Sequence, residues 1–103
     1  MKVEQKCKVI AKEWLTQDTV SMTLNVGDML YHARTVAGQR IYPGQFVHIK
    51  CGDGLLLRRP ISVCFWEGTA EEGTIRIVFE VKGEGTRWLA RRPVGHKVDV
   101  LGP

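Results

Sequence analysis

Five consecutive residues in the middle of the chain, Arg58-Arg59-Pro60-Ile61-Ser62, have the chemistry of an anion-binding segment. Pro60 has a fixed φ angle and disfavours helical geometry in the residue before it, so Arg59 should leave the chain in a defined direction. A guanidinium placed in this way can bind a phosphate through two parallel hydrogen bonds. Ser62 alternates with Ile61, so its hydroxyl should lie on the opposite face of a strand, where it could meet a polar heterocycle. Arginines that only keep the surface soluble, with a serine that faces water, explain the same spacing equally well.

Residues 81–86, VKGEGT, form a second candidate anion site. Val81 and Lys82 end a strand, two glycines follow, and a helix is expected to begin at Thr86. The start of a helix offers backbone N–H groups and a partial positive charge, and Gly85 lets a ligand approach the backbone closely. The segment is a candidate pyrophosphate cradle, but it lacks the third glycine of a dinucleotide-binding fingerprint. A turn that needs glycine only for its geometry is the alternative. One ligand with a pyrophosphate and a flat ring would satisfy both segments.

The other residues with reactive or metal-binding side chains are scattered. No clustered spacing such as Cys-x-x-Cys occurs among the cysteines and histidines, which are Cys7, Cys51, Cys64, His32, His48 and His96. This pattern excludes a zinc or iron–sulfur site evident from the sequence and is typical of reduced thiols. No apolar run has the length of a membrane span, and the first residues lack the apolar core of a signal peptide. We therefore expect a cytoplasmic protein with no membrane contact.

The size and charge of the chain point to one ordinary globular domain. It has 103 residues, of which 44% are hydrophobic and 25% are charged, with a formal net charge of +4. A chain of this length can form one compact core. Because acidic and basic residues are interspersed, the chain lacks the long basic stripe that generic nucleic-acid binding favours. We expect no nucleic-acid partner.

Five stretches with period-two alternation are expected strands, at about residues 19–26, 45–51, 60–66, 74–82 and 96–102. A sixth, at about residues 2–14, alternates less cleanly but is rich in residues that favour strands. In the five alternating strands, the alternate apolar residues should share one inward face, and in residues 60–66 these are Ile61, Val63 and Phe65. Glycine turns separate the strands, and many short strands in a small domain predict a sandwich or a closed barrel. One helix is predicted, in residues 85–93, with Thr86 as a candidate N-cap. Residues 27–42 could form a loop, a hairpin extension or a helical turn.

Four motifs in one order carry a resemblance to a known family. PGQFVHIKC, LLRRPISV, VKGEGTRWLA and VDVLGP all lie within residues 43–103. This order resembles the FAD-binding domain of the ferredoxin–NADP reductase superfamily, and it is most similar to the electron-transfer subunit of dihydroorotate dehydrogenase. Residues 1–42 match the family only in their strand pattern.

The resemblance implies an all-β fold, a six-stranded antiparallel Greek-key barrel with one short helix, that binds FAD. By the family's motif, Arg59 would bind the FAD pyrophosphate and Ser62 would lie near the isoalloxazine. Pro60 and Ile61 complete this motif, and Ile61 stands where the family usually has a tyrosine. The cofactor-binding set that the resemblance implies adds Val81, Lys82, Gly85 and Thr86, of which the last two would cradle the pyrophosphate and the backbone of the first two would line the flavin.

The resemblance also implies a role in electron transfer. In such proteins FAD takes a hydride from NADH and passes electrons to a 2Fe-2S cluster, and here onward to a catalytic dihydroorotate dehydrogenase subunit. We expect residues 1–103 to be the FAD-binding domain, with the NAD-binding and iron–sulfur regions in a C-terminal part that is missing, so that this fragment alone is not catalytically complete. A flavin subunit of a sulfide dehydrogenase or of an NADPH–ferredoxin transhydrogenase remains an alternative. A non-enzymatic β-barrel that binds RNA or protein is another.

Overall fold

The computed structural model describes residues 4–27, 46–51, 58–67 and 73–101, which form six strands and one short helix. The elements are β1 Glu4–Trp14, β2 Thr19–Asn25, β3 Phe46–Lys50, β4 Arg58–Glu67, β5 Thr74–Glu80, α2 Glu84–Ala90 and β6 Lys97–Leu101. All six expected strands are confirmed, although β4 begins two residues before Pro60. The segment 27–42, for which the sequence left three possibilities open, lies outside the described residues after Gly27. No helix in the described ranges is long and apolar enough to cross a membrane.

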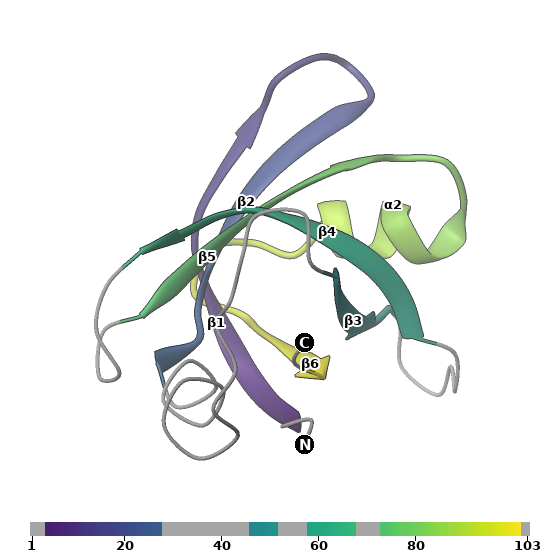
Figure 1. Ribbon diagram of the computed structural model, residues 1–103. Helices are drawn as coiled ribbons and strands as arrows, with labels where there is room; N and C mark the ends of the chain where they lie inside the picture. Colours follow the sequence, from purple (N-terminus) through teal and green to yellow (C-terminus); the bar gives the residue numbers. More distant parts are fainter. Residues whose placement is uncertain (1–3, 28–45, 52–57, 68–72, 102–103) are drawn as a thin grey trace.

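The strands close into a barrel in the order β1-β2-β5-β4-β3-β6 (Figure 1), and every neighbouring pair is antiparallel. The strands β3, β4 and β5 follow one another as neighbours, and β6 returns beside β3. This is the order of a Greek key. The all-β class and the Greek-key barrel with one short helix are therefore confirmed.

Alternate residues of the strands fill the barrel, because successive side chains of a strand point to opposite faces. The buried apolar residues include Cys7, Val9, Val20, Met22, Leu24, Val26, Val47, Ile49, Ile61, Val63, Ile75, Ile77, Phe79, Val98 and Val100. The inward faces that the sequence predicted for residues 19–26, 45–51, 74–82 and 96–102 are confirmed, with Val81 half-buried against the same core.

The prediction for Phe65 is wrong, because the side chain of this residue is 50% exposed. The register between β4 and β5 pairs Val63 with Ile77 but Phe65 with Arg76. Cys64 is thus an extra residue, and such a β-bulge moves the residues after it to the other face of the strand. The thiol of Cys64 lies 3.3 Å from the Arg76 carbonyl oxygen and 3.5 Å from its Nε.

The helix α2 lies between β5 and β6 in the chain and is held to the barrel at its C-terminal end (Figure 1). Leu89 and Ala90 are buried in the core. The ammonium group of Lys12, from β1, donates to the carbonyl oxygens of Ala90 at 3.0 Å and Arg92 at 3.1 Å. The Ala90 carbonyl belongs to the last helical turn and the Arg92 carbonyl lies just after it. Carbonyl groups at a helix end lack partners within the helix, so a cation is well placed there. The helix ends at Ala90, three residues before the expected end.

Candidate cofactor-binding site

A cleft of about 300 Å³ lies where the start of β4 meets the first turn of α2. The described residues that line it are Arg59, Lys82, Gly83, Gly85 and Thr86. Four of these five residues were predicted from the sequence as cofactor-binding, and they come from two segments more than twenty positions apart. Gly83 was missed, although it is the first glycine of the G-x-G that the sequence displays.

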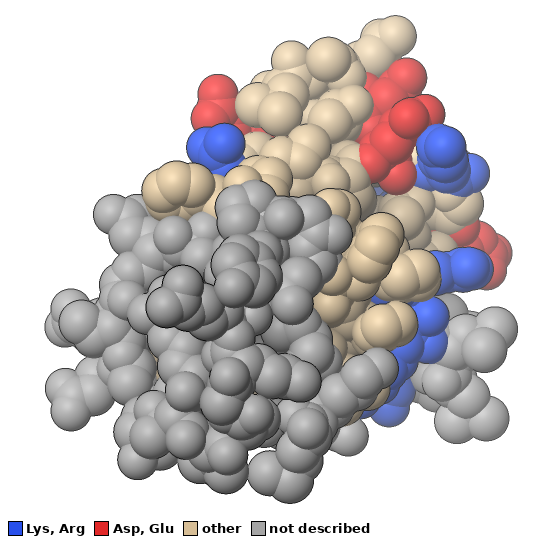
Figure 2. Space-filling view, in the orientation of Figure 1, with Lys and Arg blue, Asp and Glu red and all other residues tan. Residues whose placement is uncertain are grey.

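The two neighbouring arginines have different surroundings. Arg58 Nη2 lies 2.8 Å from Asp99 Oδ1, and Arg58 Nη1 donates to the carbonyl oxygens of His48 and Asp99, each at 3.3 Å. Arg59 is exposed at the cleft and forms no ion pair with any residue in the described ranges. Of the pair, Arg59 is therefore the guanidinium that an anion in the cleft could reach. In Figure 2 the Lys and Arg side chains lie mainly on the right, the side on which Figure 1 places α2 and the start of β4.

The Arg59 side chain passes directly over the backbone of Gly85. A Cβ atom at position 85 would lie 3.1 Å from Arg59 Nε, 3.4 Å from Arg59 Cγ and 3.3 Å from the Cβ of Cys51. Gly85 is itself buried. Glycine therefore allows a close approach here, which brings a guanidinium against the first turn of a helix and would be crowded by any side chain at position 85.

The turn before α2 is organised by the hydroxyl of Thr86. Thr86 Oγ1 accepts from the backbone N–H of Lys82 at 2.9 Å and of Gly83 at 3.2 Å, and it donates to the Gly83 carbonyl at 3.3 Å. The expected N-cap is wrong: Gly83 is the cap, the helix begins at Glu84, and Thr86 is its third residue. Thr86 reaches back to the cap as the third residue of a capping box does. Its hydroxyl shapes the turn, while the N–H groups of the first turn point outward from the helix end.

The backbone N–H groups of Val81 and Lys82 are both used within the fold. Val81 N–H donates to the Asp18 carbonyl at 2.7 Å, and Lys82 N–H donates to Thr86 Oγ1. A flavin that lies against these two residues could therefore find acceptors in their carbonyl oxygens but no donors in their N–H groups.

The first half of β4 leaves one of its sides open. Residues 58–62 of β4 pair with β3, and residues 63–67 pair with β5. Within the described strands, no β5 residue is paired with residues 58–62, so this edge of β4 can meet a ligand. Pro60, which has no N–H, fits such an unpaired edge.

The structure separates the side chains of residues 59–62 onto two faces of β4. Ile61 is buried in the core and can offer a ligand only its backbone, whereas Pro60 and Ser62 are exposed on the outer face. Ser62 stands opposite Phe46, which is 54% exposed. By alternation, Arg59 lies on the same face of β4 as the buried Ile61, but it stands at the end of the barrel, against Gly85. A ligand that contacts both Arg59 and Ser62 must therefore pass around the open edge of β4.

Two further groups near the site have unusual surroundings. Burial raises the pKa of the Cys51 thiol, and the nearby charge of Arg59 lowers it by a smaller amount, so the thiol beside Gly85 stays neutral and poorly nucleophilic. His48 Nδ1 is buried without a hydrogen-bond partner. No group of three or more His, Cys, Asp or Glu side chains that could hold a metal occurs among the described residues.

Two proteins with similar sequences carry the same description. The chain is 37% identical over 105 aligned positions to the "Dihydroorotate dehydrogenase B (NAD(+)), electron transfer subunit" of Fusobacterium nucleatum, which covers 100% of this chain and 36% of the relative. It is 48% identical over 71 residues to the protein of the same description from Bacillus cereus strain B4264, which covers 67% of this chain and 27% of the relative. The chain thus spans only about a third of the length of these relatives. No protein-family model matches it.

Three solved structures share the fold. An NADH-dependent reduced ferredoxin-NADP oxidoreductase, described for flavin-based electron bifurcation, aligns with a TM-score of 0.68 at 23% identity over 94% of this chain and 32% of its own. The ferredoxin reductase of carbazole 1,9a-dioxygenase, in an FAD apo form, gives 0.62 at 18% identity over 99% of this chain and 30% of its own. A flavohemoglobin from Malassezia yamatoensis, with bound FAD and heme, gives 0.60 at 21% identity over 98% of this chain and 25% of its own.

The sequence and structural matches agree with each other and with the barrel described above. The chain is therefore similar, along about a third of their length, to proteins described as electron transfer subunits of dihydroorotate dehydrogenase B, and it has the barrel fold of ferredoxin-reductase-type proteins.

Proposed function

We propose that residues 1–103 are an FAD-binding barrel domain of an electron transfer subunit, which passes electrons from NADH through FAD towards a 2Fe-2S cluster and a catalytic dihydroorotate dehydrogenase subunit. The observation that carries the proposal is the Arg59 guanidinium packed over Gly85 at the first turn of α2. A guanidinium and the N–H groups of a helix start are complementary to a pyrophosphate. Relatives described as electron transfer subunits of the same enzyme support the assignment.

The residues of the cleft fit the diphosphate part of FAD. Arg59 would bind its oxygens, and the absent Cβ of Gly85 leaves room for the backbone of α2 to approach them. The Thr86 hydroxyl, fixed by three contacts to Lys82 and Gly83, would hold the turn in the shape that presents these N–H groups.

The unpaired edge of β4 fits the flavin ring. Pro60, Ile61 and Ser62 would line the ring with their backbone, and the Ser62 hydroxyl on the outer face would hydrogen bond to its edge. The carbonyl groups of Val81 and Lys82 would accept from ring N–H groups, since their own N–H groups are already used. The chemistry that bound FAD would supply is to accept two electrons from a hydride donor and to release them one at a time.

The rest of the pathway belongs to parts that this chain does not supply. Among the described residues no cluster of cysteines could hold an iron–sulfur centre, and the relatives are about three times as long as the chain. We assign the NAD-binding and 2Fe-2S regions to the remaining part of such a protein. The free thiols Cys7, Cys51 and Cys64 support a cytoplasmic location, where thiols stay reduced.

The test is a titration of the purified chain with FAD, followed by flavin absorbance and fluorescence, with FMN as the control ligand. We expect saturable binding that favours FAD, because FMN lacks the second phosphate and the adenosine. Arg59→Ala should weaken FAD binding by about 1.5–3 kcal/mol, the range for one charge-assisted contact, and should narrow the preference over FMN.

The matched control is Arg87→Ala, which removes an exposed guanidinium of α2 that does not line the cleft. This variant should bind FAD as the parent chain does. Equal affinity of the parent chain and Arg59→Ala would remove Arg59 from the site. The flavin assignment would be refuted if neither this chain nor a longer protein that contains it, as long as the relatives, showed saturable FAD binding.

A further inference from the structure

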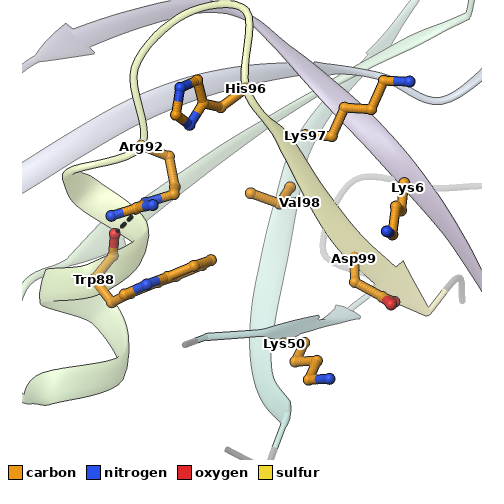
Figure 3. A pocket seen from close by; sticks show the side chains of 8 residues that line it. All are labelled: Lys6, Lys50, Trp88, Arg92, His96, Lys97, Val98 and Asp99. Atoms are coloured by element: carbon orange, nitrogen blue, oxygen red, sulfur yellow. Dashed lines mark hydrogen bonds between the residues drawn. The ribbon is translucent and has the colours of Figure 1, made fainter. Parts of the chain in front are cut away.

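A second cleft, of about 360 Å³, lies at the other end of α2 (Figure 3). Trp88 and Arg92 come from α2 and the turn after it, and they face β6, which contributes Lys97, Val98 and Asp99. Lys6 and Lys50 come from β1 and β3, the strands on the two sides of β6. None of these residues lines the cleft of Arg59, so the two clefts are separate.

Arg92 is held in a fixed position at this cleft. Its Nε donates to the Trp88 carbonyl oxygen at 3.1 Å, and its guanidinium carbon lies 4.2 Å from the centre of the Trp88 ring. The two terminal nitrogens of Arg92 make no hydrogen bond or ion pair to any described residue. A guanidinium that is stacked and oriented in this way loses little side-chain entropy when it binds a carboxylate. Stacked tryptophan and arginine are also the residue types that dominate the binding energy of protein interfaces.

Lysines surround this pair on the outer face of three neighbouring strands. The register places Lys6 opposite Asp99 and Lys8 opposite Lys97, and Lys50 lies on β3 at the other side of β6. We call Lys6, Lys8, Lys50, Arg92 and Lys97 the basic face. Like charges directly opposite each other destabilise a pair of strands. The Lys8–Lys97 pair therefore lowers the stability of the barrel and forms no stabilising contact within it.

Asp99, the one acidic residue among the described residues that line the second cleft, is already neutralised. Asp99 Oδ1 lies 2.8 Å from Arg58 Nη2, and this ion pair is partly buried. The four basic residues of the lining, Lys6, Lys50, Arg92 and Lys97, form no ion pair with a described residue. The face therefore presents uncompensated positive charge to an approaching molecule.

We infer that the basic face is a docking surface for an acidic surface of a partner protein, with Trp88 and Arg92 at its centre. This inference rests on the proposed function for the identity of the partner, the catalytic subunit that accepts the electrons. A protein surface fits better than a small anion, because Lys8 extends the charge beyond the cleft and the strands spread it over about 10 Å. Exposed lysines at the rim of an interface accelerate association more than they slow dissociation.

The experiment measures association of this chain with the catalytic dihydroorotate dehydrogenase subunit encoded in the same genome, with and without FAD, at low and at physiological ionic strength. Lys97→Glu should lower the association rate constant about tenfold at low ionic strength and flatten its salt dependence. The matched control, Arg76→Glu, makes the same charge change on β5, across the barrel from β6, and should associate like the parent chain.

The melting temperature of Lys97→Glu shows whether this variant is folded. The substitution turns the repulsive Lys8–Lys97 pair into an attractive one, so the melting temperature should rise while association falls. Arg92→Gln, which keeps a planar amide over Trp88, should raise the dissociation rate instead. FAD affinity should stay unchanged in both variants, which separates a failure of docking from a failure of the proposed function.

Three outcomes would overturn the inference. The first is a Lys97→Glu chain that associates as fast as the parent chain, and the second is no complex at all at low ionic strength. The third is binding of a mixed-sequence single-stranded RNA that is lost in Lys97→Glu while association with the catalytic subunit is kept, because the face would then serve nucleic acid.

Discussion

Arg58 and Arg59 are adjacent and chemically identical, but the barrel gives them different roles. Arg58 lies on the outer face of β4 and holds Asp99 of β6, so it ties two parts of the barrel together. Arg59 lies at the end of the inward series and reaches the backbone of Gly85. Because one step along a strand reverses the direction of a side chain, a pair of arginines serves both a structural contact and a binding site.

We predict that Gly85→Ala weakens FAD binding about tenfold, which is about 1.4 kcal/mol. The new methyl group would lie 3.1 Å from Arg59 Nε, so the guanidinium must move away from the first turn of α2. Equilibrium titration of the variant measures this loss. Since the effect acts through Arg59, Gly85→Ala should cost little more when it is added to Arg59→Ala, and fully additive losses would contradict this reason.

The sequence pointed to four of the five described residues that line this cleft, but not to what each one does. The order of motifs predicts Arg59, Gly85 and Thr86 as cofactor-binding residues. The sequence could not show that the Thr86 hydroxyl is used inside the turn, or that Gly85 is needed for a contact with an arginine 26 positions earlier. Such roles depend on which segments the closed barrel brings together.

At the scale of elements, α2 is fixed at both ends by hydrogen bonds from outside its own ladder. Thr86 Oγ1 accepts from the turn at its start, and Lys12 donates to the carbonyl groups at its end. A helix of seven residues has little stability of its own, so these contacts and the burial of Leu89 must hold it. The two clefts lie at the two ends of this helix, and both depend on its position.

We predict that Lys12→Met lowers the free energy of unfolding by about 1–3 kcal/mol, because two carbonyl groups lose a charged donor. Urea unfolding followed by tryptophan fluorescence measures the change. Lys8→Met is the matched control on the same strand: it removes an exposed lysine that repels Lys97, and it should leave stability equal or higher. Equal losses in the two variants would show that the contact with α2 contributes nothing.

The elements themselves were largely predictable, because a barrel with one buried face imposes a strict alternation on its strands. The β-bulge at Cys64 was not, since period-two alternation continues in the letters through Phe65 and only the partner strand shows which residue is extra. The contact of Lys12 with α2 was equally hidden, because it joins residues 78 and 80 positions apart.

At the scale of the whole molecule, closure of the barrel depends on its shortest seam. In the described strands, β3 and β6 share only the pairs His48–Leu101 and Ile49–Val100. The ion pair of Arg58 with Asp99 joins β4 to β6 across β3 and reinforces this seam. Lys50 and Lys97 flank this seam. We expect that their positive charges do not separate β3 from β6, because the closed core holds the strands together.

The stability of the barrel should decrease in alkaline solution through Cys7. Burial, with a smaller contribution from the Asp99 carboxylate, raises the pKa of the Cys7 thiol from 9.0 to about 12. A raised pKa means that the folded state holds the proton more tightly than the unfolded state. The stability that this contributes is fully present below pH 9 and is lost progressively as the pH rises from 9 to about 12.

Measurement of the free energy of unfolding below and above pH 9, in the parent chain and in Cys7→Ala, tests this coupling. The parent chain should lose more stability on alkalinisation than the variant, so the difference between them should shrink. Cys64→Ala, which removes an exposed thiol, should follow the parent chain. Parallel pH profiles for the parent chain and Cys7→Ala would show that the buried thiol does not couple to folding.

The pairing of β1 with β6 makes the barrel suitable for circular permutation. Glu4 and Leu101 are direct partners in this antiparallel pair, so the outer ends of the first and last strands lie side by side (Figure 1). A few added residues could join these ends, and new ones could be opened at the exposed turn between β1 and β2 around Gln17. Such a circularly permuted chain would keep all six strands and both clefts, because neither cleft includes a residue of that turn.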